Sequence, residues 1–158
     1  LFRDVYNGST PFHHAAEHGC RKTMQALLTR YPRGVNVRNN GDLTMLHCAI
    51  EEGKPKKIID QDDEEGLENN LEAMVRFLLT PPHCVEVNGQ DIEGDTALHY
   101  VANNGPDYTQ VAEILLEHGA SVTVKNDQGE TPLDVCREDD EQMRQILRTA
   151  QPGGSEPQ

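Results

Sequence analysis

The sequence predicts an all-α fold, a solenoid of stacked helix pairs from which β-hairpin fingers project. The main evidence is a short string, GDTALHY at 94–100, that recurs in altered form as GSTPFHH at 8–14, TMLHC at 44–48 and GETPLDV at 129–135. The threonines of the four copies are 34, 52 and 35 residues apart. A second observation is that only 35% of the residues are hydrophobic and 4% are aromatic. Stacked repeats tolerate this composition because each copy buries its apolar face only against its neighbours.

The third copy shows the expected order of elements within a repeat. Thr96 begins a first helix that runs to Asn104 and ends at Gly105, because glycine readily adopts the left-handed conformation of a helix cap. A second helix over 109–118 carries apolar residues at helical spacing, Leu115 among them. The segment 125–129, KNDQG, is rich in turn-forming residues, so we expect it at the tip of a finger.

The other copies follow this layout with differences. In the second copy, Gly41-Asp42 reverses the usual order of the turn residues, which leaves the turn type open but not the place in the stack. In the fourth, Asp134 stands where the others have His, and the second helix over 141–148 has only a narrow apolar edge, as expected of a solvent-facing terminal repeat. The first copy opens within a finger, so we expect a segment of a longer protein or a loss of upstream repeats. The expected organisation is one domain over 1–150, with repeats at about 2–36, 37–88, 89–123 and 124–150, and a flexible tail over 151–158.

The long step between the second and third copies comes from extra sequence at 54–70, KPKKIIDQDDEEGLENN. It is inserted between the two helices of the second repeat and carries three Lys and six acidic residues. Two interpretations remain open. It is either a solvated loop, tolerated at small entropic cost, or a docking loop for a specific partner.

The period and the T-P-L-H-like core resemble the ankyrin repeat, a β-turn followed by two antiparallel helices. The resemblance covers residues 2 to about 150. It implies that His13, His47 and His99, which share one repeat position, hydrogen-bond the neighbouring Thr and the backbone to brace the turn. It also implies protein binding through a concave face, formed by the fingers and the exposed edge of the first helices.

The charge balance limits the partners. The chain has 14 Lys and Arg against 27 Asp and Glu, a net charge of −13 at pH 7. Such a chain repels the phosphates of nucleic acids and of anionic membranes and attracts basic partners. We therefore expect no direct nucleic-acid or membrane binding, and a partner protein that presents a basic segment.

The cysteines and the hydropathy pattern indicate an intracellular protein of the cytoplasm or nucleus. Cys20, Cys48, Cys84 and Cys136 show no CxxC spacing, which fits a reducing compartment. The sequence has no secretory signal and no apolar run near 18 residues.

No catalytic or metal-binding constellation emerges from the sequence. A zinc site built from His18, Cys20, His83 and Cys84 would draw ligands from different repeats without paired spacing. The carboxylate-rich run in the insertion lacks the correctly placed glycine and the twelfth-position ligand of a calcium loop. The sequence contains no Gly-rich phosphate loop and no GxSxG motif. We therefore expect a protein that is not an enzyme and that has no cofactor and no metal site.

The candidate partner-binding residues lie where the resemblance places the concave face. Those on the edge of the first helices are His14, Glu17, His18, Cys48, Glu51, Glu52, Tyr100, Asn103, Asn104, Glu138 and Asp139. Those on the fingers are Arg38, Asn39, Asn40, Gln90, Asp91, Ile92, Glu93, Asn126, Asp127 and Gln128. Acidic residues occupy the helix edge in three of the four copies, and Tyr100 is a central amphipathic anchor of the kind enriched in binding hot spots.

These observations favour a non-enzymatic protein-interaction module that is monomeric on its own. It would serve as a scaffold, adaptor or inhibitor that binds a basic or mixed-charge segment of another protein. One variant of this hypothesis is an inhibitor similar to the NF-kappa-B inhibitor family, which masks a basic region of a transcription factor. An alternative of another class is the targeting segment of a larger enzyme whose activity lies outside this chain.

Overall fold

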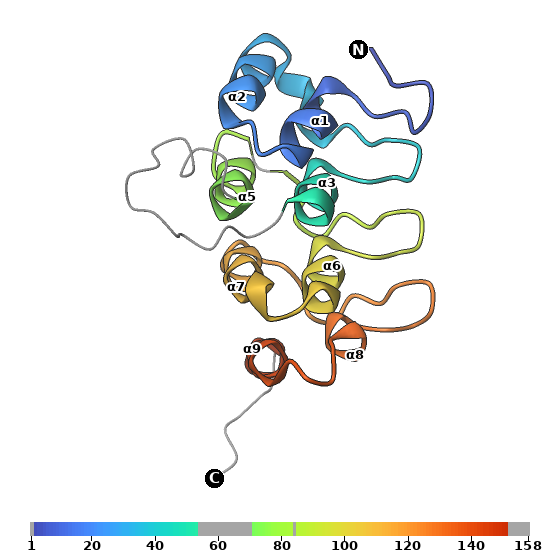
Figure 1. Cartoon of the computed structure of the whole chain (residues 1–158), viewed down its shortest axis with the longest axis vertical. Coiled ribbons are helices and arrows are strands. Elements are labelled where there is room, and N and C mark those ends of the chain that lie inside the picture. Colours follow the sequence, from blue (N-terminus) through green and yellow to red (C-terminus); the bar gives the residue numbers. More distant parts are fainter. Residues whose placement is uncertain (1, 54–70, 84, 152–158) are drawn as a thin grey trace.

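The computed structural model describes residues 2–53, 71–83 and 85–151, so the insertion at 54–70, Cys84 and nearly all of the predicted tail lie outside the described residues. Helices occur in pairs, and the pairs stack along the long axis of the molecule (Figure 1). The inner column contains α1 (Pro11–Glu17), α3 (Met45–Glu52), α6 (Ala97–Asn104) and α8 (Pro132–Val135). The outer column contains α2 (Arg21–Arg30), α5 (Leu71–Leu79), α7 (Thr109–Glu117) and α9 (Glu141–Thr149). Two short 3-10 helices, η1 (Pro32–Asn36) and η2 (Pro106–Tyr108), follow α2 and α6.

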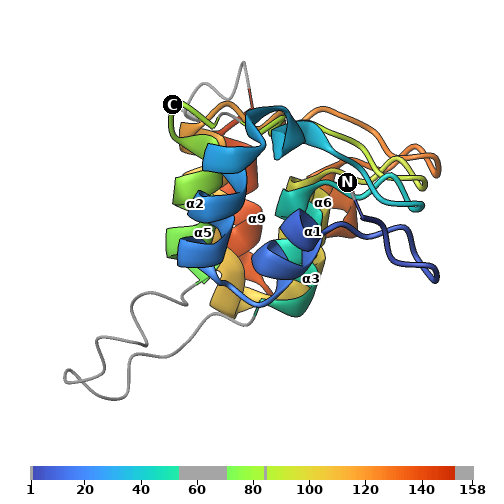
Figure 2. The same cartoon turned by 90° about the horizontal axis from the view of Figure 1, so that it is seen from above.

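Four fingers project from the inner column on the side away from the outer column (Figure 2). We number them in chain order, at 3–9, 38–43, 90–95 and 125–130. The described residues form no extended strand, and the third finger is closed by a single antiparallel bridge between Gln90 and Thr96. The predicted solenoid of helix pairs with projecting fingers is therefore confirmed.

A single hydrophobic core runs between the two columns from the first helix pair to the last. Its largest fully buried side chains include Phe12 in α1, Met24 in α2, Ile50 in α3, Leu115 in α7 and Leu147 in α9. Successive helix pairs therefore share one apolar layer, as expected when each repeat buries its face only against its neighbours. The outward positions of α9 are polar, which leaves little apolar surface at the end of the stack.

The motif histidines brace the helix starts, as expected, and they also join one repeat to the next. In the second repeat, Nδ1 of His47 accepts from the backbone N–H of Thr44 at 3.1 Å and lies 2.9 Å from the Thr44 hydroxyl. Because that N–H can only donate, the ring proton must sit on Nε2, which then donates to the carbonyl of Asp95 at 3.1 Å. His13 and His99 repeat this geometry toward the carbonyls of Leu43 and Glu130, at 3.2 and 3.1 Å.

The fourth repeat shows what the histidine adds. Oδ2 of Asp134 accepts from the backbone N–H of Thr131 at 2.8 Å and from its hydroxyl at 2.7 Å, so the helix start is still capped. These hydrogen bonds lower the pKa of Asp134. An ionised carboxylate has no proton to donate to a following repeat, so Asp134 braces its own turn only.

The buried histidines predict that the protein loses stability as the pH falls below about 6.5. Burial lowers the pKa of His13 and His47 in the folded state, whereas the unfolded imidazole keeps a pKa near 6.5. The stability from the neutral bridges is therefore fully present above pH 6.5. It is lost as the pH falls toward the folded-state pKa, because the unfolded chain binds protons first, by up to about 1.4 kcal/mol per pH unit for each group.

Urea unfolding at pH 7.5 and 5.5 measures this loss. His47→Gln should reduce the pH dependence of the unfolding free energy. His18→Gln, which changes an exposed ring bonded only to the His14 carbonyl of its own helix, should leave it unchanged. Equal slopes for the wild type and His47→Gln would contradict the assignment.

Each of the last three fingers is closed by one buried side chain at the start of its turn. Oδ1 of Asp91 accepts from the backbone N–H groups of Glu93 and Asp95, both at 2.9 Å. Asn39 and Asn126 form the same pair of bonds in the second and fourth fingers. A side chain that accepts from the backbone two residues on is the usual way in which Asx residues stabilise a turn.

Long side chains on the legs of the fingers connect neighbouring fingers. Arg3, Arg38 and Gln90 each donate to a carbonyl of their own finger and to one in the next finger. For Gln90 the acceptors are Gly94 at 2.7 Å and Lys125 at 3.1 Å. Arg3 reaches the carbonyl of Arg38 at 2.8 Å, and Arg38 in turn reaches that of Gln90. The fingers are therefore held as one array.

The reversed turn of the second finger keeps its place in the stack at a conformational cost. Asp42 adopts a left-handed backbone with φ of 55°, at the position where the other fingers have Gly8, Gly94 and Gly129 at φ of 69°, 81° and 82°. This region favours glycine, because a Cβ approaches the following carbonyl oxygen there.

Asp42→Gly should therefore raise the free energy of unfolding by about 0.5–1 kcal/mol, through relief of this strain. The structure gives the Asp42 carboxylate no hydrogen bond or ion pair among the described residues, so the substitution removes none. The reverse change, Gly129→Asp, is a matched control, because a Cβ there would meet no atom within 4 Å. It should destabilise by a similar amount in urea unfolding. If neither change alters the midpoint, backbone strain is not what distinguishes the second finger.

Candidate partner-binding face

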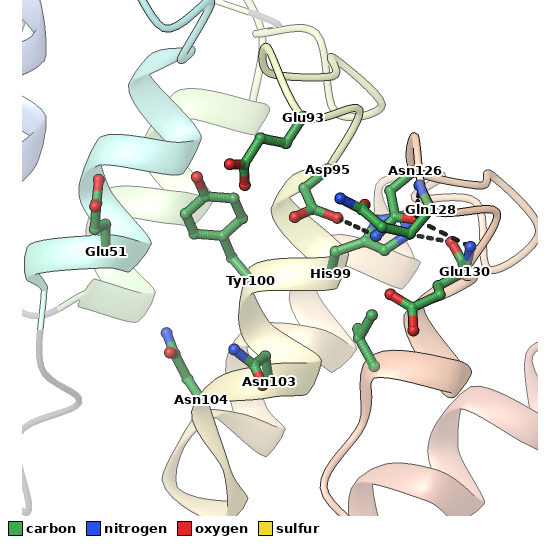
Figure 3. Close-up of a pocket in the computed structure, with 11 residues that line it drawn as sticks. Glu51, Glu93, Asp95, His99, Tyr100, Asn103, Asn104, Asn126, Gln128 and Glu130 are labelled. Atoms are coloured by element: carbon green, nitrogen blue, oxygen red, sulfur yellow. Dashed lines mark hydrogen bonds between the residues drawn. The ribbon is translucent and has the colours of Figure 1, made fainter.

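A groove of about 700 Å³ is hollowed into the face formed by the inner helices and the last two fingers. We call it the central groove (Figure 3). Seven of the predicted binding residues line it: Glu51, Glu93, Tyr100, Asn103, Asn104, Asn126 and Gln128. Val135 also lines it, as do Asp95, His99 and Glu130, which were not among the predicted residues. The sequence did carry one signal for two of them, because Asp95 and Glu130 are acidic residues at the same repeat position, directly before the motif threonine.

Tyr100 stands in the middle of the groove with its ring held from two sides. Its hydroxyl donates to Oδ2 of Asp91 at 2.8 Å. Its ring meets the His47 ring edge to face, with centroids 5.2 Å apart and planes at 69°. Partial burial, together with the hydrogen bond to Asp91, raises the pKa of Tyr100, so the hydroxyl stays protonated. A ring that is fixed before a partner arrives loses little conformational entropy on binding.

Acidic side chains surround this ring. Figure 3 shows Glu51 on one side of Tyr100, and Asp95 and Glu130 on the other. Partial burial and the nearby charges of Glu52 and Glu17 raise the pKa of Glu51. Asp95 is engaged, since its Oδ1 accepts from Nδ2 of Asn126 at 2.9 Å. Among the described residues that line the groove, none is Lys or Arg.

Three predicted finger residues belong to the scaffold. Asn39, Asp91 and Asn126 have exposed fractions of only 8%, 9% and 8%, and their side chains close the finger turns. This burial gives them a structural role, because a turn residue that satisfies two backbone N–H groups points into the turn. Asn126 also borders the central groove.

Arg38 and Gln90 are also structural, because their side chains are bound to carbonyls of two successive fingers. Nη2 of Arg38 additionally forms an ion pair with Glu86 at 2.9 Å. Using either side chain to contact a partner would break hydrogen bonds that hold the finger array together.

Cys48 is the fourth predicted residue whose side chain is buried. It lies on α3 with 6% exposure. Burial, with the nearby Glu51 and Glu17 carboxylates, raises the pKa of its thiol to about 12. Such a thiol stays protonated and unreactive at neutral pH.

Glu138 and Asp139 are exposed, but they do not lie on the edge of an inner helix. Helix α8 ends at Val135, and Cys136 takes an extended backbone, so both acids lie in the turn before α9. Asp139 pairs there with Nε of Arg137 at 3.4 Å. They border the face without lining the central groove.

The remaining predicted residues lie at the tips of the fingers and along the first two inner helices, where Glu17 is half-buried and the others are exposed. On α1, Nδ1 of His14 is 3.1 Å from a carboxylate oxygen of Glu17. On the third finger, Ile92 exposes 65% of its surface, an apolar tip beside the acidic groove. The other exposed residues of this set are His18, Asn40, Glu52 and Asp127.

The described part of the chain contains no group of three or more His, Cys, Asp or Glu side chains placed to hold a metal ion. None of its helices is both long enough and apolar enough to cross a membrane.

Comparison with known proteins connects this architecture to a family. A model described as ankyrin repeats in three copies matches residues 66–153, and a single ankyrin-repeat model matches residues 7–40. A human protein, ankyrin repeat and IBR domain-containing protein 1, is 27% identical over 150 residues, which cover 87% of this chain and 14% of that protein.

Two further relatives are named for different functions. NAD-dependent deacetylase sir2B of Dictyostelium discoideum is 29% identical over 147 residues, covering 80% of this chain and 18% of that protein. NF-kappa-B inhibitor zeta of Mus musculus is 27% identical over 160 residues, covering 90% of this chain and 22% of that protein. The chain therefore corresponds to less than a quarter of the length of each of these three relatives.

Proposed function

The chain belongs to the ankyrin repeat family, and on that premise we propose that it is a non-enzymatic protein-interaction module whose concave face binds a basic or mixed-charge segment of a partner. The observation that carries the proposal is the central groove. It combines a fixed aromatic ring, Tyr100, with the carboxylates of Glu51, Glu93 and Glu130. The net charge of −13 adds a long-range attraction for cationic partners.

We further propose that the protein is intracellular and monomeric. Its four repeats would span about 2–36, 37–88, 89–123 and 124–150. Partner binding is the role that the family supports in general. The role as a scaffold, adaptor or inhibitor rests on weaker support, which for an inhibitor is the similarity to NF-kappa-B inhibitor zeta.

A second candidate function is the targeting segment of a larger enzyme. The similarity to the deacetylase favours it, because the matched region covers only 18% of that protein. In that case the module still binds a partner, and the catalytic residues lie outside this chain. The two candidates make the same prediction for the groove.

Charge reversal in the groove tests the proposal. Glu51→Lys combined with Glu52→Lys should abolish capture of the proteins that the wild-type domain retains from a cell extract. Both side chains are exposed at the end of α3, so the fold should be unaffected by circular dichroism. A matched control reverses two exposed acids that do not line the central groove, Asp107→Lys in η2 and Glu113→Lys in α7.

The control variant changes the net charge by the same amount and should retain the captured proteins. Equal loss from both variants would show that only the total charge matters. Equal retention by both would place the interface outside the concave face. Either outcome contradicts the proposed function.

A further inference from the structure

We infer that the central groove binds one arginine side chain of the partner, with the guanidinium plane on the Tyr100 ring and its N–H groups directed to the carboxylates of Glu51 and Glu93. The inference rests on the proposed function and specifies which partner group fills the groove. Three elements of the fold meet at this place, namely α3, the third finger and α6. Figure 3 shows Glu93 above the ring and Glu51 beside it.

The carboxylates at the groove differ in whether they are free to accept a hydrogen bond from a bound ligand. Both oxygens of Asp91 are engaged, by two backbone N–H groups and by the Tyr100 hydroxyl. Asp95 is held by Asn126. The structure gives the side chains of Glu51, Glu93 and Glu130 no hydrogen bond or ion pair within the described residues, although all three line the groove. These three acceptors are therefore available to a cation from outside.

The aromatic ring is available in the same way. Its hydroxyl is anchored on Asp91 and one contact is made with His47, which fixes the ring plane. Tyr100 nevertheless remains partly exposed and borders the groove. A cation over the face of such a ring is attracted by its quadrupole, and a planar guanidinium can also stack on it.

The raised pKa of Glu51 supports this placement. Its causes are partial burial and repulsion from Glu52, Glu17 and Asp91, in that order. An incoming cation would offset the repulsion among these carboxylates, so the groove gains more from a cationic ligand than an isolated surface acid would.

The arrangement favours arginine over lysine. The acceptors come from separate elements and approach from different directions, which suits a rigid fork with five donors. An ammonium concentrates its donors at one point and is strongly hydrated. In a groove of about 700 Å³ it would keep much of that water and gain little from the ring. The weakly hydrated guanidinium can use the ring and the carboxylates together.

The test uses three small probes and the complete chain. Acetyl-Gly-Arg-Gly-amide, its Lys counterpart and its citrulline counterpart are titrated into the isotopically labelled protein at low salt and followed by NMR. We expect the Arg probe to shift the resonances of Tyr100, Asn103 and Asn104, and to bind at least threefold more tightly than the Lys probe. The citrulline probe, which is planar but uncharged, should not bind measurably. Equal affinity for Arg and Lys, or shifts centred on another surface, would overturn the inference.

Variants separate the groove from the charge of the whole protein. Glu51→Gln, Glu93→Gln and Tyr100→Leu should each weaken binding of the Arg probe at least threefold, and Tyr100→Leu should also remove the preference over Lys. Glu113→Gln, on the outer helix α7, removes the same charge and should leave the affinity unchanged. Circular dichroism establishes that each variant is folded. Glu51→Gln and Glu93→Gln change exposed side chains, so they test the site even if Tyr100→Leu does not fold. Equal weakening by Glu113→Gln would show a non-specific field and would contradict the site.

The result is distinguishable from that of the proposed function. If the Arg probe does not bind but partner capture is lost on charge reversal at Glu51 and Glu52, the concave face binds another group and only the arginine site is wrong. If the Arg probe binds but charge reversal at Glu51 and Glu52 leaves partner capture unchanged, the proposed interface is wrong.

Discussion

Leu115→Ala should lower the free energy of unfolding by about 2–5 kcal/mol, the largest effect on stability that we expect from one substitution. Leu115 lies on α7 and has no exposed surface. It belongs to the continuous core between the two columns. Burying a leucine side chain is worth roughly 1.5–3 kcal/mol, and truncation also leaves a cavity that the neighbouring helix layers fill only partly.

Leu116→Ala is a matched control, because it makes the same chemical change one residue further along α7. Leu116 is only partly buried against the core, so its loss should cost clearly less. Urea unfolding followed by circular dichroism measures both variants. A change below about 0.5 kcal/mol for Leu115→Ala, typical of surface positions, would mean that the helix faces are assigned wrongly.

Tyr100→Ala should weaken partner binding by about 2 kcal/mol or more, which is roughly a 30-fold faster dissociation. The reason is the position of the ring at the centre of the groove, fixed by Asp91 and His47 before the partner arrives. Central, well-packed aromatic residues contribute most of the energy of many interfaces, whereas peripheral charges mainly affect the association rate.

Tyr100→Phe is the control, since it keeps the ring and removes only the hydroxyl. Asp91 still accepts from two backbone N–H groups in this variant, so the third finger should stay closed. Its dissociation rate should lie close to that of the wild type. The experiment is surface-based kinetics with a captured partner, with the fold of each variant measured in parallel.

Salt provides an independent measurement on the same complex. The association rate should fall steeply as the ionic strength rises, because the steering charges are screened over a Debye length of about 8–10 Å. The dissociation rate should depend on salt much less. A complex whose rates change neither with salt, nor with Tyr100→Ala, nor with charge reversal at Glu51 would contradict this interface. The partner would then bind the outer helices or the insertion.

The concave face divides into residues that build it and residues that are free to bind. Side chains near the base of each finger form hydrogen bonds that hold the finger array together. Asp91, for example, closes a turn, and Gln90 bridges two fingers. The tips and the groove carry the unengaged groups, among them the exposed Ile92 and the carboxylate of Glu93. This division explains why substitutions in the fingers should separate into those that destabilise and those that affect binding.

The helices and their order were predictable from the sequence because their signals are local. The motif threonine fixes where each inner helix starts, since its side chain and backbone N–H pair with the residue three positions later. The second helix of the third repeat was expected over 109–118 and is observed as Thr109–Glu117. The role of the motif histidine within its own turn was also expected and is confirmed.

Only the tertiary structure decided which of the candidate residues are available to a partner. Arg38 and Gln90 look like exposed finger residues in the sequence, but their acceptors lie 52 and 35 residues away in the chain. Likewise, the groove brings Glu51 of α3 together with Tyr100 of α6 and Glu130 of the fourth finger. The structure within each repeat follows from the local sequence, because the hydrogen bonds of its turns and helix caps span only three to five residues. The contacts between repeats depend on how the repeats stack, and that spacing is set by the packing of the shared core rather than by any local pattern.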